Sequence, residues 1–146
     1  MKNKKKFLII SVIMILLFIV IWKLRESNYK DTYFYYGQGD TWMATYTVSE
    51  INSTYYETIY IQYLYDSDIS ERQLEKISKE IGAIEYRLIG NSQEISSAFP
   101  QELNVYLNYQ HAKFIKVDQE YKTERTMNIT INWQDKEENI TLKRQN

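Results

Sequence analysis

A run of apolar residues near the start of the chain constrains its fold more than any other feature. Residues 7–22 read FLIISVIMILLFIVIW, and Ser11 is the only polar residue among them. A buried helix of a soluble protein would carry polar residues on one face, and this run has none. The run spans about 24 Å as a helix, or about 27 Å when it continues to Leu24 with the Lys23 ammonium at the interface. Because a bilayer core is roughly 30 Å thick, we expect a transmembrane helix over residues 7–24.

The charges on either side of this run predict its orientation. Four lysines lie in residues 1–6, whereas only Lys23 and Arg25 follow the run directly. This bias places the N-terminus in the cytoplasm and the rest of the chain outside the membrane. Cleavage of a secretory signal is the open alternative, but it needs small residues just after the apolar region. The first glycine is Gly37 and the first alanine is Ala44, which favours an uncleaved signal anchor.

The net charge divides at the same place. The 146 residues include 18 basic and 19 acidic ones, and six of the basic residues but none of the acidic ones fall within residues 1–25. The remainder therefore holds 12 basic residues against 19 acidic ones, a net charge of −7. An acidic domain of this kind is not expected to bind nucleic acid. The absence of cysteine excludes disulfides, thiolate sites and a lipid-anchored cysteine, and a single histidine excludes a multi-histidine metal centre.

The rest of the chain has the pattern of a β protein. Apolar and polar residues alternate with a period of two in seven short segments bounded by turn residues. These segments are residues 32–36, 42–49, 56–65, 83–89, 105–110, 127–133 and 140–142, with loops expected over residues 92–104 and 113–125. The pattern predicts an antiparallel, immunoglobulin-like β-sandwich over residues 32–146, joined by a linker of residues 25–31 to the membrane helix.

One segment follows a helical pattern instead. Ser70 and Gln73 have the spacing of a capping box, in which each side chain meets a free backbone N–H group of the first turn. Leu74, Ile77 and Ile81 share one helical face, and Gly82 is a suitable stop. We therefore expect one short helix, from this cap to Gly82.

Two motifs resemble a known group of proteins. Residues 36–42 read YGQGDTW, and residues 131–142 read INWQDKEENITL, close to a hairpin of the form I-x-W-x-G-K-x-E-x-I-x-L. The chain resembles small membrane- or lipid-anchored envelope proteins of Gram-positive bacteria, whose ectodomains begin with glycine, an acid and tryptophan and end with this hairpin. Asp135 replaces the usual glycine, and aspartate tolerates the same turn. The resemblance covers most of residues 33–143. It implies an outward-facing β-sandwich-like domain, and it implies no activity and no site residues.

The candidates for catalysis and metal binding are weak. His111 is the only imidazole, but the sequence has no G-x-S-x-G turn that would present a serine to it. Residues 66–70 read DSDIS and suggest a calcium loop, which also needs glycine at its sixth position and an acid at its twelfth. Those positions hold Glu71 and Ile77, so a turn leading into the helix cap explains the segment better. We expect no catalytic residue, cofactor or metal.

Tyrosine is enriched, with 14 residues between Tyr29 and Tyr121. Tyr35 and Tyr36 are adjacent, as are Tyr55 and Tyr56, so that in a strand the two rings of each doublet point to opposite faces. A tyrosine ring offers flat apolar area with a polar tip, which suits contacts with sugars or proteins. Tyr35, Tyr36, Tyr55 and Tyr56 are therefore the predicted binding surface, and cross-strand aromatic packing is the alternative.

These observations predict a non-enzymatic, single-pass envelope protein. Residues 7–24 hold it in the membrane, and the external domain contacts cell-wall polymer or another envelope protein. A hydrolase with an unrecognised site and an accessory subunit of a membrane complex are the two alternatives.

Overall fold

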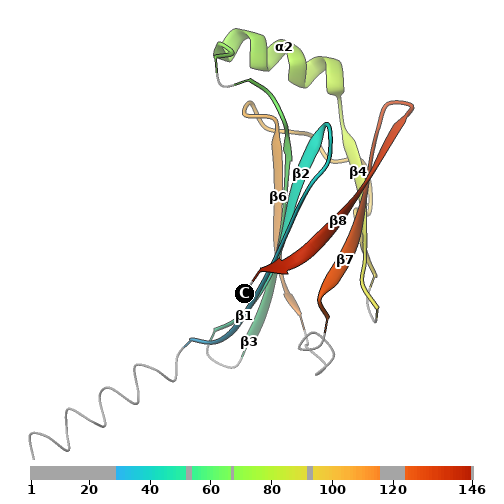
Figure 1. Ribbon diagram of the computed structural model, residues 1–146. Coiled ribbons are helices and arrows are strands. Elements are labelled where there is room, and N and C mark those ends of the chain that lie inside the picture. Colours follow the sequence, from blue (N-terminus) through green and yellow to red (C-terminus); the bar gives the residue numbers. More distant parts are fainter. Residues whose placement is uncertain (1–28, 52–53, 67, 92–93, 116–123, 146) are drawn as a thin grey trace, which may run out of the picture.

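The computed structural model describes residues 29–51, 54–66, 68–91, 94–115 and 124–145. These residues form eight strands and one helix, so the described chain is mainly β with a single helix, as the sequence predicts (Figure 1). The predicted membrane helix over residues 7–24 and its basic flank lie outside the described residues. Among the residues that are described, no helix has the length and apolar character needed to cross a membrane.

All eight strands belong to one antiparallel sheet. In sheet order they are β5 (Glu94–Ser96), β4 (Ile84–Ile89), β7 (Thr126–Trp133), β8 (Lys136–Gln145), β1 (Tyr29–Gln38), β2 (Trp42–Ile51), β3 (Thr54–Tyr63) and β6 (Asn108–Ile115). An immunoglobulin-like sandwich has two separate sheets, so that detail of the prediction is wrong. The reason is that β1 pairs with both β2 and β8 and joins the two halves of the sheet.

The continuous sheet nevertheless packs against itself in the manner of a sandwich. Strands β2, β3 and β6 lie across the interior from β4 and β7 (Figure 1). The rings of Trp42 in β2 and Trp133 in β7 meet edge to face at 5.5 Å, and those of Tyr86 in β4 and Tyr109 in β6 are 5.7 Å apart. Alternate residues of each central strand fill this interior, as the period-two pattern predicts.

The helix, α2 (Glu71–Ile81), covers the end of the sheet that lies away from the start of β1 (Figure 1). The capping box of Ser70 and Gln73 is present, and Leu74 and Ile81 are buried against the core. Gly82 ends the helix with a φ of 71°, a conformation that glycine adopts without strain. The predicted helix is confirmed at both ends.

The segment between β4 and β7 departs most from the prediction. Residues 94–96 form the short strand β5 inside a predicted loop, and β6 runs from Asn108 to Ile115 rather than over residues 105–110. The Asn104 side chain accepts the backbone N–H groups of Tyr106 and Asn108, and Leu107 has a φ of 58°. This asparagine-centred turn takes Val105 and Tyr106 out of the sheet, and both are exposed.

Candidate binding surface

The four predicted tyrosines divide between the two faces of the sheet. Tyr35 is fully buried, and its hydroxyl donates to the backbone carbonyl of Glu124 at 3.1 Å. Tyr55 packs against the core from the inner face and donates to the Glu50 carboxylate at 3.1 Å. Tyr36 and Tyr56 lie half-buried on the outer face. The structure therefore does not bring the four rings together, and only the outer two belong to a common surface.

That surface is a regular array on strands β1, β2, β3 and β6. The antiparallel register aligns the outward side chains into four cross-strand rows of four. The rows are Gln38–Met43–Gln62–Asn108, Tyr36–Thr45–Tyr60–Gln110, Phe34–Thr47–Thr58–Ala112 and Thr32–Ser49–Tyr56–Phe114. Strand spacing and rise give the array dimensions of roughly 14 Å by 20 Å. We call these 16 residues the uncharged face.

No residue of the uncharged face carries a charge. Charged residues make up 25% of the chain, so about four would be expected among 16 solvent-facing positions. Nine of the side chains instead end in an aliphatic hydroxyl or an amide, and five are aromatic. The aromatic ones are Phe34, Tyr36, Tyr56, Tyr60 and Phe114. The composition is that of a surface that contacts uncharged groups through rings and hydrogen bonds.

The other half of the same sheet differs. Its outward side chains include five charged ones on β4, β5 and β8, namely Glu85, Arg87, Glu94, Glu137 and Lys143. Arg87 and Glu94 form an ion pair at 2.7 Å, and each holds the other's pKa in favour of the charged form through this hydrogen bond. The lack of charge is therefore confined to one half of the outer surface, because outward positions elsewhere in the same sheet do carry charged residues.

Two tyrosines of the uncharged face are held in place by their neighbours. Tyr36 donates its hydroxyl to the side-chain carbonyl of Gln38 at 2.7 Å, and Tyr60 makes the same contact with Gln62 at 2.7 Å. Partial burial raises the pKa of Tyr60, so its hydroxyl stays protonated as a donor. Fixed rings lose little conformational freedom when a ligand stacks on them.

Phe34 and Phe114 add exposed aromatic area to this face. Phe114 is 73% exposed at the edge strand β6 and pairs with the Tyr56 ring at 5.2 Å. Phe34 is 39% exposed on β1. Neither residue, nor Tyr60, was a candidate from the sequence. The period-two pattern places Phe34 and Tyr60 on outward positions, but Phe114 lies in a segment predicted as a loop, and the register between β3 and β6 was needed to bring it beside Tyr56.

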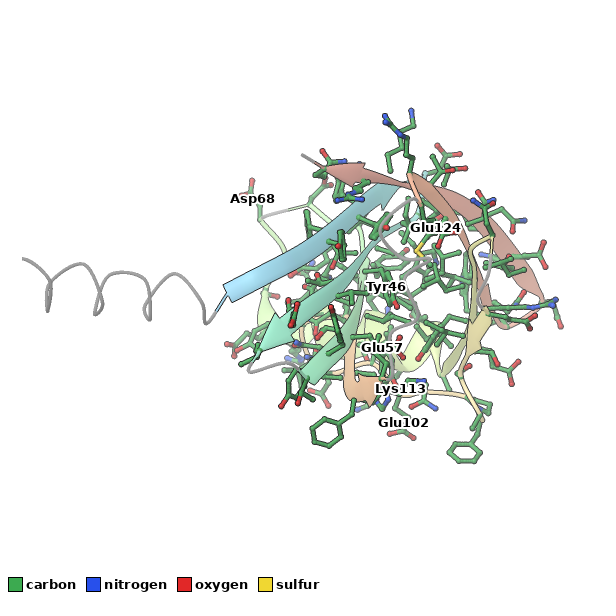
Figure 2. All side chains as sticks on the ribbon, turned by 90° about the horizontal axis from the view of Figure 1, so that it is seen from below. Tyr46, Glu57, Asp68, Glu102, Lys113 and Glu124 are labelled. Carbon is green, nitrogen blue, oxygen red and sulfur yellow. The ribbon has the colours of Figure 1, made fainter. Side chains whose placement is uncertain are left out.

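The inner face holds the main polar cluster of the interior. Glu57 is only 3% exposed; it accepts the Tyr46 hydroxyl at 2.8 Å and pairs with the Lys113 ammonium at 2.9 Å (Figure 2). These contacts compensate the burial of the carboxylate. His111 lies two residues before Lys113, opposite Ile59, and is exposed. The described residues contain no group of three or more His, Cys, Asp or Glu side chains placed to hold a metal ion.

Comparisons with known proteins identify no relative of this chain. The chain matches no protein-family model, no curated protein and no solved structure. The functional argument therefore depends on the surface itself.

Proposed function

We propose that the protein is a membrane-anchored interaction module that displays the uncharged face outside the cell membrane and binds an envelope partner there. The observation that carries this proposal is the 16-residue array without a charge, on a domain whose net charge is −7. A surface whose only role is to keep an acidic domain soluble would carry charges, as the other half of the sheet does. A binding role accounts for both the missing charges and the exposed rings.

The anchor in this proposal is the apolar segment of residues 7–24. Its lysine-rich flank orients the chain with the N-terminus in the cytoplasm. A single cysteine added after Asn146 tests the orientation. It should react on intact cells with a membrane-impermeant thiol reagent, and labelling only after lysis would contradict the proposal.

A charge placed within the uncharged face tests the binding role. Thr47 lies on β2, a middle strand of the array, between Phe34 and Thr58. Thr47→Lys would therefore put an ammonium among side chains that carry no negative charge. Asn139 is an exposed outward residue of β8 on the charged half, so Asn139→Lys adds the same charge elsewhere.

Both full-length variants would be expressed in the native cells, cross-linked on the intact cells and purified in mild detergent. The wild type and Asn139→Lys should retain the same cross-linked envelope material, and Thr47→Lys should lose most of it. Equal recovery from all three folded proteins would contradict the proposed role of the face.

A further inference from the structure

We infer that the ligand of the uncharged face is a neutral polysaccharide, bound as an extended chain along the row of Tyr36, Thr45, Tyr60 and Gln110. This inference depends on the proposed function and names the class of partner. It rests on the register of this row, on the absence of charged residues from the surface and on the fixed orientation of the two tyrosines.

The row alternates rings with hydrogen-bonding groups. Tyr36 pairs with Thr45, Thr45 with Tyr60, and Tyr60 with Gln110, on four adjacent strands. Two strand spacings separate the tyrosines, roughly 10 Å. Sugar rings present apolar C–H faces that stack on aromatic rings and hydroxyls at their edges that bond to hydroxyl and amide groups. A row of ring, hydroxyl, ring and amide offers both kinds of contact along one direction.

The charges argue for a neutral polymer. An anionic glycan would need cationic partners, and the uncharged face has none. β8 adjoins the face along β1, where it pairs Gln145 with Phe34 and Lys143 with Tyr36, so that one basic side chain borders the row. The surrounding domain is acidic and would repel a polyanion.

The chemistry of the array also distinguishes a glycan from a protein partner. The centre of a protein interface is depleted in serine and enriched in aromatic residues, methionine and arginine. Three of the four outward residues of β2 carry a hydroxyl, and all four outward residues of β3 end in a hydroxyl or an amide. Such a hydroxyl-rich centre matches the hydroxyls of a sugar chain better than an apolar protein surface.

The test measures binding of the full chain, in detergent micelles, to soluble neutral polysaccharides and to an anionic one. The neutral probes are a β-glucan, a galactan and chitin oligosaccharides, and the anionic probe is polygalacturonate. Isothermal titration calorimetry gives the dissociation constants. The wild type should bind at least one neutral probe and should bind polygalacturonate at least tenfold more weakly.

Substitutions within the row assign the binding to it. Tyr36→Ala and Tyr60→Ala should each raise the dissociation constant about tenfold, because each removes one stacking ring. Tyr36→Phe keeps the ring and should stay within threefold of the wild type. Asn139→Ala, on the charged half, should have no effect. Circular dichroism confirms that each variant is folded.

Three results would overturn the inference: no binding to any neutral probe, tighter binding to polygalacturonate, or equal binding by the wild type and both alanine variants. If cross-linking to an envelope protein is nevertheless lost in Thr47→Lys, the proposed function stands and only the ligand class is wrong. If Thr47→Lys also retains its partners, both proposals fail.

Discussion

Removal of the Lys113 ammonium should destabilise the fold, because it leaves the buried Glu57 carboxylate without its ion-pair partner. Glu57 is almost fully buried in the interior, with Lys113 at 2.9 Å and the Tyr46 hydroxyl at 2.8 Å as its partners. Lys113→Met keeps most of the aliphatic side chain and leaves the buried charge with the hydroxyl of Tyr46. Breaking a buried ion pair in this way costs about 3–5 kcal/mol when both partners are buried.

The expected loss is smaller here because the Lys113 side chain is 48% exposed. Solvent screens the pair, and water can approach the carboxylate once the ammonium is gone. We expect a loss of about 2 kcal/mol in the free energy of unfolding. For a domain of this size, that corresponds to a fall in melting temperature of roughly 8 °C.

The assay is thermal unfolding of the full chain in detergent, followed by tryptophan fluorescence. Trp42 and Trp133 are both in the core and report its exposure. Lys76→Met is the matched control, because Lys76 pairs with Glu80 at 3.6 Å on the exposed side of α2. That variant should lose less than about 0.5 kcal/mol.

A double-mutant cycle isolates the pair. Glu57→Gln removes the charge and keeps an acceptor for the Tyr46 hydroxyl. The double variant of Glu57→Gln and Lys113→Met should lose about 1 kcal/mol less than the sum of the single variants. Additive losses, or a loss in Lys113→Met no greater than in Lys76→Met, would refute the reasoning.

Two further predictions concern the backbone and the interior. Gly82→Ala should cost about 1–3 kcal/mol in thermal unfolding, because a side chain strains the φ of 71° although nothing lies within 4 Å of the new Cβ; an unchanged melting temperature would contradict this. Burial, and then the neighbouring Tyr109, raise the pKa of Tyr86 far above its usual value. Stability should therefore fall as the pH rises above about 10, where a tyrosine in the unfolded chain loses its proton and folded Tyr86 keeps it. Tyr86→Phe should reduce this loss in a pH series of thermal unfolding, and an equally steep loss would contradict the assignment.

The sequence predicted those parts of the fold that local patterns encode. The capping box at Ser70 and the stop at Gly82 define α2, and strict alternation identifies β2, β4 and β7. The start of β6 was missed because apolar and polar residues already alternate from Val105 onward. In the structure the Asn104 side chain forms a turn there, and the strand begins only after it. The pairing of β1 with β8 was missed because long-range register leaves no local signal.

In the candidate site, too, local patterns were predictable and long-range strand pairing was not. Alternation predicted that the two rings of each doublet would point to opposite faces, and the structure places Tyr36 and Tyr56 on the outer face and Tyr35 and Tyr55 on the inner face. The rows of the uncharged face could not be predicted, because β3 and β6 are separated in the chain by the helix and two strands. The absence of charge from 16 aligned positions is visible only after those strands are paired.

Hydroxyl-radical footprinting tests the central claim most directly, because it reports on the uncharged face in its cellular setting. The full chain would be oxidised on intact native cells and, separately, after purification in detergent, and the aromatic side chains compared by mass spectrometry. Phe114 and Phe99 make a matched pair, 73% and 71% exposed, with only Phe114 on the uncharged face. We predict that cells protect Phe114 and Tyr60 but leave Phe99 as reactive as in detergent. Equal oxidation of Phe114 and Phe99 on cells would contradict the account.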